Sequence, residues 1–278
     1  MTREEYFNEL EKILKENEVL NAEEILKKCE RRFDLARDAG IDIDEAIEMI
    51  GTPFEVYEKS KNNSEKPKPN FSKIYNLEVK GAISEDIIVK RNDGDKIVIN
   101  IDEVLQPYTK INQSDNNIVI DLNRPNKINN FSNCTIEILV GNDIAFNKLT
   151  LASVSGDLCL YGELMVECLS LSAVSGDIKV DNVSGDTCKA QCVSGDIEIN
   201  QAQEQNIVTS CVSGDITFGN VKTKECKVST TSGDASARYI ECDYASLNTL
   251  SGDINLKGKI KEKKARSFSG SINYCEVK

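Results

Sequence analysis

A Ser-Gly-Asp triplet returns at nearly constant intervals through the second half of this 278-residue chain. The serines of six successive triplets stand at numbering steps of 20, 19, 19, 19 and 19, and a degenerate Ser-Gly-Ser follows after a step of 18. A fixed period of about 20 residues indicates one structural unit stacked on itself. The repeats begin at Ser155, Ser175, Ser194, Ser213, Ser232, Ser251 and Ser269.

Apolar residues occupy fixed columns when the repeats are aligned on these serines. Polar residues stand between the columns, and this alternation is typical of strands with one buried face. Equivalent strands of successive coils are therefore expected to pair in parallel, about 4.8 Å apart. The columns three and five places after the serine and four places before it hold Leu158, Ile178, Ile197, Ile216, Ala235, Ile254 and Ile272; Leu160, Val180, Ile199, Phe218, Ala237, Leu256 and Tyr274; and Leu151, Leu171, Ala190, Thr209, Val228, Leu247 and Ala265.

The triplet itself is interpreted as the corner of a coil. Glycine tolerates a positive φ angle, which a corner often needs, and serine and aspartate can bond to nearby backbone groups. An additional triplet at residues 184–186 lies half a coil after Ser175 and indicates that the opposite corner can take the same turn. The glycines given this structural role are Gly156, Gly176, Gly195, Gly214, Gly233, Gly252 and Gly270.

The aspartates of the triplets should stack in one column along the solenoid. Carboxylates about 4.8 Å apart repel one another, so a bound cation could stabilise them. The favoured alternative is a row of solvated turn residues bonded to their own backbone, because the Gly-Gly-x-Gly-x-Asp nonapeptide of calcium-binding β-rolls is missing. The candidate metal ligands are Asp157, Asp177, Asp196, Asp215, Asp234 and Asp253.

Apolar residues in segment 1–60 follow helical spacing. Segments 2–5 and 21–24 match the capping-box pattern, in which a small polar residue is followed three places later by glutamate. We expect a second helix after the cap at 21–24, with apolar residues from Ile25 to Ala36 and an end near Gly40, and a third helix from Asp42 that stops at Gly51. Thr52-Pro53 then begins a short fourth helix, with proline at its favoured first position.

Four segments are expected in the chain. Residues 1–58 form a small all-α domain, and residues 59–70 form a flexible polar linker with two prolines and no apolar residue to bury. Residues 71–146 are an irregular β region that provides the first divergent coils or a β cap. Residues 147–278 are the Ser-Gly-Asp solenoid.

The irregular β region lacks the regular period. Asn-Asp-Gly-Asp at 92–95 and Ser-Asp-Asn-Asn at 114–117 are turn signals between its strands. The strands are expected around residues 77–79, 87–89, 97–101 and 118–120.

Composition excludes several classes of function. The net charge is −12, with 12 basic and 18 acidic side chains in residues 1–70 and 22 and 28 in the rest, so direct nucleic-acid binding is not expected. The chain has no His, which removes Ser-His-Asp and Cys-His catalysis and the commonest metal ligand. We expect no catalytic residues and no cofactor. No signal peptide or transmembrane run is visible, so a cytoplasmic location is expected.

The ten cysteines are interpreted as free thiols. No C-x-x-C pair occurs, which argues against zinc and redox motifs. Cys192 and Cys211 each stand two places before a Ser-Gly-Asp, in a column that otherwise holds small residues. Packing is therefore the predicted role of these thiols, and their number suits a reducing compartment.

Two exposed features have competing interpretations. The basic residues Lys257, Lys259, Lys261, Lys263, Lys264 and Arg266 could bind an anionic ligand or membrane surface. Protection of the last edge strand against end-to-end addition is favoured instead. The outward column Thr150, Ser170, Lys189, Lys227 and Ser246 could bind a partner or glycan, but a solvated surface is favoured.

The repeated Val-Ser-Gly-Asp-Ile segments, as at 174–180 and 193–199, resemble the bacterial domain family named "putative adhesin". The resemblance covers residues 71–278. It implies a mainly β fold, a single-stranded right-handed parallel β-helix in which a coil takes about 19 residues, with no known biochemical activity. In this chain the solenoid follows the small all-α domain.

The N-terminal segment resembles a second family, the HAAS (helix-turn-helix-associated α-helical signalling) domain. The resemblance runs from Glu4-Glu5-Tyr6-Phe7 to Asp44–Pro53, where an acidic residue and Glu-Ala-Ile precede Gly-Thr-Pro. Such domains in Gram-positive bacteria accompany PadR-like transcriptional regulators and usually precede membrane spans, whereas a polar linker follows here. The resemblance implies docking on a protein partner. The candidate docking residues are Phe7, Phe33, Ile47, Ile50 and Pro53.

These observations predict a non-enzymatic binding or scaffold protein, with a helical signalling module joined to an adhesin-like solenoid. The expected partner is a regulatory protein, and the HAAS resemblance implies one of the PadR-like class. One alternative is a structural, polymer-forming or cell-surface adhesin-type solenoid that self-associates through its ends. Another alternative is a cation-binding β-roll that uses the aspartate column.

Overall fold

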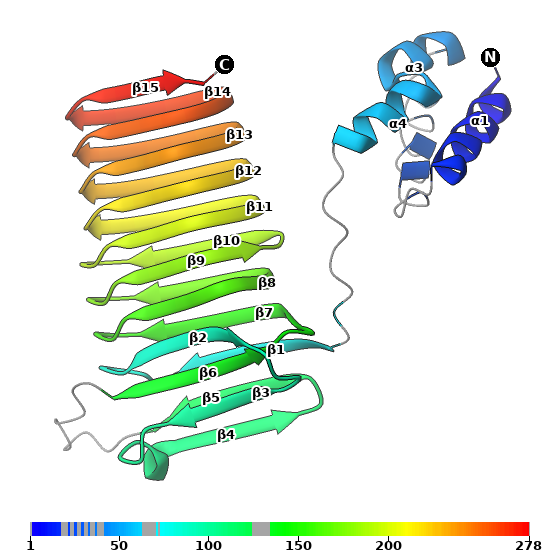
Figure 1. Cartoon of the computed structure of the whole chain (residues 1–278). Coiled ribbons are helices and arrows are strands. Elements are labelled where there is room, and N and C mark those ends of the chain that lie inside the picture. Colours follow the sequence, from blue (N-terminus) through cyan, green and yellow to red (C-terminus); the bar gives the residue numbers. More distant parts are fainter. Residues whose placement is uncertain are drawn as a thin grey trace. The chain divides into compact units, whose positions relative to one another are not determined.

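The chain folds into two compact units, Met1–Asn70 and Phe71–Lys278, which are drawn in Figure 1. This computed structural model describes residues 2–17, 22, 25–26, 29–30, 33, 37, 42–62, 71, 73–123 and 134–277. The first unit is helical, and the second is a right-handed parallel β-solenoid with about 19 residues per coil, so the predicted fold class is confirmed.

Helices α1 (Arg3–Glu16), α3 (Ile43–Ile50) and α4 (Pro53–Asn62) begin where their capping residues predict. Thr2 and Glu5 form the expected capping box, with each backbone N–H donating to the other side chain at 2.8 and 3.2 Å. Asp42 caps α3 through the N–H of Glu45 at 2.9 Å. Gly51 ends α3 with a φ of 99°, a conformation that glycine adopts readily.

The helical unit has its own apolar core. Tyr6 lies in it with its ring 4.8 Å from that of Phe33, and its hydroxyl donates to the carbonyl of Gly51 at 2.7 Å. The expected cap at residues 21–24 lies outside the described residues, as does most of the expected second helix. Among its described residues, the buried apolar ones are Tyr6, Leu10, Leu14, Cys29, Phe33, Ala46, Ile50 and Tyr57.

The solenoid is one continuous sheet wound into coils, as Figure 1 shows. Its regular part consists of parallel strands whose inward residues form a single core. Its strands are β1 (Lys73–Lys80), β2 (Asp86–Asn92), β3 (Ile97–Ile101), β4 (Thr109–Ser114), β5 (Asn117–Leu122), β6 (Thr135–Gly141), β7 (Ile144–Ser153), β8 (Leu158–Ala173), β9 (Ile178–Ser184), β10 (Thr187–Cys192), β11 (Ile197–Ser213), β12 (Ile216–Ser232), β13 (Ala235–Ser251), β14 (Ile254–Ser269) and β15 (Ile272–Glu276).

A regular coil is one long strand rather than two short ones. β11, β12 and β13 each run for 17 residues, from the residue after one triplet to the serine of the next. Only the Ser-Gly-Asp corner interrupts the strand, and the opposite corner is a bend within it. The exception is the coil formed by β9 and β10. Its additional triplet at residues 184–186 separates the two strands at the opposite corner, as expected.

The first coil lies inside the stack instead of at its end. β1 pairs in parallel with both β5 and β7, and β2 pairs with both β6 and β8. After β1 and β2 form the first coil, the chain forms the coil of β5 and β6 on one side of it. The chain then crosses the first coil, and β7 and β8 pair with its other side. Arg91 secures this crossing, because its guanidinium donates to the carbonyls of Gly141, Ile144 and Glu163 at 2.6–2.7 Å.

Antiparallel strands close the N-terminal end of the solenoid. β3 pairs antiparallel with β6, and β4 pairs antiparallel with β5. The β4–β5 turn includes Asp115 at a φ of 49°, a left-handed conformation that Asp tolerates better than most residues. The irregular region thus contains both the divergent coils and the cap that its sequence allowed.

Candidate functional site

The corner glycines are required by contact between coils. Among the seven, only Gly214 has a positive φ, and its value of 159° is nearly extended backbone. The expected positive φ is therefore wrong as the general reason. A Cβ on Gly195 would collide with the carbonyl oxygen of Gly176 in the preceding coil. The same collision recurs at Gly176, Gly214, Gly233, Gly252 and Gly270.

Most side chains of the small-residue column before the corners donate hydrogen bonds to corner carbonyls of the preceding coil. The thiols of Cys192 and Cys211 lie 3.2 Å from the carbonyl oxygens of Gly176 and Gly195. The hydroxyls of Thr230, Thr249 and Ser267 donate in the same way. Their acceptors are the carbonyl oxygens of Gly214, Gly233 and Gly252, respectively. Packing was the expected role of this column, and the structure adds that most of its members satisfy a buried carbonyl.

The aspartate column forms a ladder of hydrogen bonds from coil to coil. The N–H of Asp177 donates to Oδ1 of Asp157 at 2.8 Å, and that of Asp196 donates to Oδ1 of Asp177 at 3.0 Å. The ladder continues through Asp215, Asp234, Asp253 and Ser271. Hydrogen bonds from Ser271 lower the pKa of Asp253, since bonding to the charged form favours that form.

This ladder gives one oxygen of each stacked carboxylate a backbone partner. Each bond joins the carboxylate to the backbone of the next coil, whereas the expectation was a bond to its own backbone. Within the described ranges, no cluster of three or more His, Cys, Asp or Glu side chains could hold a metal ion.

The series of corners begins earlier than the sequence period indicates. Ile83-Ser84-Glu85-Asp86 occupies the first corner, and Asp86 Oδ1 accepts the N–H of Asp157 at 2.9 Å. The carbonyl of Glu85 lies against Gly156, just as the carbonyl of Gly156 lies against Gly176 in the following coil. The sequence signal for this corner was Ser-x-Asp, with Glu85 in place of the glycine. The sequence period could not reveal it, because all the strands from β2 to β7 lie between this corner and the next.

An exposed apolar residue precedes the serine at nearly every corner. Val174, Val193 and Val212 are 43, 43 and 49% exposed, and Phe268 is 87% exposed. Thr231 interrupts the series. We call this column the apolar ridge, and its members are Ile83, Val154, Val174, Val193, Val212, Leu250 and Phe268.

A buried carboxyl group lies beside the opposite corner. Glu204 is 4% exposed, and neither of its carboxyl oxygens has a hydrogen-bond partner. The register of β9 with β11 places it one coil above Gly185, in the inward column that continues through Thr223 and Cys242. Burial, together with the nearby charges of Asp186 and Glu167, raises the pKa of Glu204 to about 9. The carboxyl group is therefore protonated at neutral pH.

None of the ten cysteines forms a disulfide, and eight of them are buried. Burial raises the pKa of Cys188 and Cys226 far above the ordinary thiol value, and it raises that of Cys242 to about 11. Since thiolates are the nucleophilic and metal-binding form, these side chains act as core residues.

The last coil has a charged residue over the open end of the core. Lys263 aligns with Ala245 of the buried column, and its Nζ lies 3.3 Å from the ring centroid of Tyr274. Inward-pointing charge is a known protection of sheet edges. Lys261 pairs with Asp243 of the preceding coil at 2.6 Å. These contacts support edge protection as the role of the basic segment.

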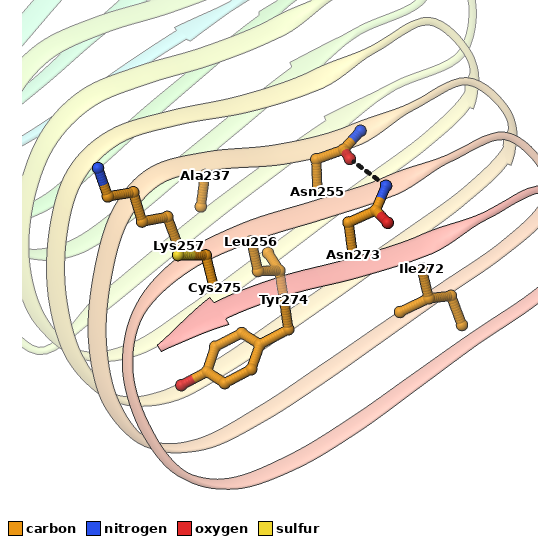
Figure 2. A pocket seen from close by; sticks show the side chains of 8 residues that line it. All are labelled: Ala237, Asn255, Leu256, Lys257, Ile272, Asn273, Tyr274 and Cys275. Atoms are coloured by element: carbon orange, nitrogen blue, oxygen red, sulfur yellow. Dashed lines mark hydrogen bonds between the residues drawn. The ribbon is translucent and has the colours of Figure 1, made fainter. Parts of the chain in front are cut away.

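An open hollow of about 510 Å³ lies beside this end. Figure 2 shows its lining, in which Asn273 donates to Asn255 at 2.9 Å and Lys257 lies near Cys275. Its other lining residues are Ala237, Leu256, Ile272 and Tyr274.

The candidate docking residues lie mostly inside the helical unit. Phe33 and Ile50 are 4 and 5% exposed, and Pro53 is buried as well. Phe7 and Ile47 are partly buried against the same core. The large apolar side chain on its described surface is Phe54, which is 59% exposed. The sequence signal for Phe54 was its place beside Pro53 in the first turn of α4.

The outward column from Thr150 to Ser246 is half-buried or exposed and lies on the solenoid surface. No helix within the described parts of the chain is long and apolar enough to cross a bilayer.

Residues 74–278 match the family described as Toastrack DUF4097. A "putative adhesin" from Bacteroides fragilis NCTC 9343 is similar in structure, with a TM-score of 0.54 and 17% identity over 75% of this chain and 94% of that one. A second from Parabacteroides merdae ATCC 43184 has a TM-score of 0.48 and 17% identity over the same shares. At such identity the likeness concerns the fold. No curated protein sequence matches the chain.

Proposed function

The chain belongs to the Toastrack DUF4097 family, and we propose that it is a non-enzymatic binding protein. In this proposal the solenoid is a rigid scaffold, and the helical unit docks on a regulatory protein partner of the PadR-like class. The resemblance of the helical unit to HAAS domains supports the choice of partner. The proposed location is the cytoplasm, where free thiols remain reduced.

The exposure of Phe54 is the observation that carries the proposal. The neighbouring apolar side chains Pro53 and Tyr57 are buried, so the helical unit completes its core without Phe54. Its ring lies 6.0 Å from that of Tyr57, and the aromatic surface beyond it faces solvent. Exposed aromatic residues beside a rigid support are frequent anchors of protein interfaces.

The test measures binding of the full chain to a purified PadR-like regulator from the same genome by calorimetry. Replacing Phe54 with Ala is expected to weaken binding by roughly tenfold or more, the usual effect of losing an interface anchor. Tyr161→Ala is the matched control, because it removes an exposed aromatic side chain from the solenoid at a position outside the apolar ridge. The proposal fails if the regulator does not bind, or if residues 71–278 alone bind it equally well.

A further inference from the structure

The apolar ridge is exposed although the solenoid does not need apolar residues there. Its side chains point outward at the corners, and the inward positions of the coils are already filled by the core. Thr231 occupies one ridge position, which shows that the corner accepts a polar residue. Contiguous exposed apolar surface of a few hundred Å² is characteristic of interaction sites.

A row of carboxylates accompanies the ridge. Each triplet aspartate stands three residues after its ridge residue in the same corner. The ladder bonds from backbone N–H groups to the Oδ1 atoms hold these side chains in place. The outward residues two places before the ridge carry no charge from Ala152 to Asn248, and Arg266 follows in the last coil. Within the row itself, Lys179 pairs with Asp177 at 3.2 Å, and the aspartates from Asp196 onward lack such a lysine among the ion pairs of the described residues. The ridge is therefore apolar with fixed negative charge along one side.

The charge of the aspartate row disfavours two candidate occupants of the ridge, a second copy of the solenoid and the helical unit of the same chain. A second solenoid packed antiparallel, ridge against ridge, would bring its own aspartate row against this one, and like charges across an interface are unfavourable. The helical unit of the same chain carries 18 acidic and 12 basic side chains within residues 1–70, so it does not complement the row. The occupant must present apolar and positively charged groups together.

The length and spacing of the ridge fit a helix. Corners recur about every 4.8 Å along the solenoid, close to the 5.4 Å pitch of an α-helix. From Ile83 to Phe268 the ridge spans seven intervals between corners, or about 34 Å, the length of a helix of roughly 22 residues. We propose that the apolar ridge binds a basic amphipathic helix of a protein partner, with its apolar face on the ridge and its Lys or Arg residues facing the aspartates.

The proposal concerns the solenoid alone and stands independently of what the helical unit binds. It is tested with the full chain and three fluorescent peptides of about 22 residues. One is a Leu/Lys amphipathic helix, the second has Glu in place of Lys, and the third has the Leu/Lys composition in a shuffled order. Anisotropy should show binding of the first peptide only, weakening as salt rises from about 0.05 to about 0.5 M.

Two variants locate the binding site. The triple change Val174→Ser, Val193→Ser and Val212→Ser should weaken binding by roughly tenfold. Asp196→Asn with Asp215→Asn keeps the Oδ1 acceptors of the ladder and should reduce both affinity and salt dependence. The matched control replaces Val98, Val104 and Ile111 with Ser, since these are 44, 57 and 45% exposed but lie away from the ridge.

Circular dichroism establishes that each variant is folded before binding is measured. Equal binding of the Glu peptide, or unchanged binding by the ridge variant, overturns the proposal. Sedimentation and vesicle flotation cover the other occupants. A dimer, or binding to neutral vesicles, that disappears in the ridge variant would assign the ridge to self-association or to a lipid surface and would also overturn the proposal.

Discussion

At the scale of single residues, the corner glycine shows how the backbone of one coil restricts which residue fits at the corner of the next. The backbone of Gly176 lies so close to Gly195 that hydrogen alone fits between them. Cys192 then donates its thiol hydrogen to the same carbonyl oxygen of Gly176. The triplet is repeated because each coil presents this surface to its successor.

Gly195→Ala is expected to destabilise the solenoid by about 1–3 kcal/mol, the usual cost of forcing an extra methyl group into a close-packed site. The measurement is the midpoint of unfolding in urea, followed by circular dichroism. Gly94→Ala is the control, because a Cβ there meets only the side chain of Asn92, at 3.2 Å. Equal midpoints for the two variants would show that the coils separate easily at the corner.

Glu204 is a second case in which a single residue departs from the pattern around it. A carboxyl group in the core is tolerated because Gly185 below it has no side chain and because the group can remain protonated. Its pKa of about 9 in the folded chain exceeds the ordinary value of 4.5. The stabilising effect of the protonated form is thus complete below pH 4.5 and is lost as the pH rises toward 9.

Glu204→Gln should remove this pH dependence. In the parent chain the free energy of unfolding should fall between about pH 5 and pH 9 by up to about 1.4 kcal/mol per pH unit, the linkage value for one proton. The glutamine variant should match the parent near pH 4.5 and exceed it at pH 8. Urea unfolding across this range measures the difference, with the outward-facing Glu198→Gln as control. Parallel curves for parent and Glu204→Gln would contradict the buried, protonated carboxyl.

At the scale of the coil, each element contacts chiefly its two neighbours. β11, for example, pairs with β12 on one side and with β9 and β10 on the other. In such an array, stability is close to a sum of coil and interface terms. The chain should therefore tolerate the loss of a whole coil but not of part of one.

Deletion of residues 197–215 removes one coil and joins Asp196 to Ile216. The register is preserved, because Ile197 pairs with both Ile178 and Ile216. We expect a folded solenoid with a β-sheet spectrum and a modestly lower unfolding temperature. Deletion of residues 197–205 is the control, since it removes half a coil, misaligns the corner and should prevent cooperative unfolding. A cooperative transition in both deletions would refute coil-by-coil assembly.

The sequence predicted these coils well where the period is strict and poorly where other contacts decide. The inward columns from Leu158 to Leu256 are buried as predicted, because alternation in a strand fixes which face is inward. The prediction was wrong for the last coil, where Ile272 is 45% exposed and Ala265 and Tyr274 are only partly buried, because no further coil covers them. The corner at Ser84-Glu85-Asp86 was missed because it lacks the glycine of the other corners. Glycine is required where a corner lies against the carbonyl of the preceding corner, and that contact cannot be read from the sequence. Glu204 was missed because its neighbours Gln203 and Gln205 are polar. Its place one repeat before Thr223 and two repeats before Cys242 was the signal for its burial.

At the scale of the whole molecule, the two units have separate cores. The apolar cluster of the helical unit contains residues from Tyr6 to Tyr57, and that of the solenoid contains residues from Leu77 to Leu256. Among the residues that the structure describes, neither cluster includes a residue of the other unit. Each unit is therefore expected to fold on its own.

Residues 71–278 alone should unfold at the same temperature as the solenoid transition of the full chain, within about 2 °C, because a larger shift would indicate interface energy on the order of 1 kcal/mol. Scanning calorimetry of both proteins makes the comparison. The full chain should show one additional, smaller transition from the helical unit. A solenoid that melts much earlier without residues 1–70 would show that its stability depends on them.

The crossing of the chain near Arg91 sets an order of events during synthesis on the ribosome. β1 emerges first but lies between two strands that are made later, β5 and β7. Its edges remain unpaired until Leu122 and then Ser153 have left the exit tunnel. The coils that follow can each close on a finished neighbour as they appear. Nascent chains halted before residue 122 should therefore be the ones that chaperones retain and proteases degrade.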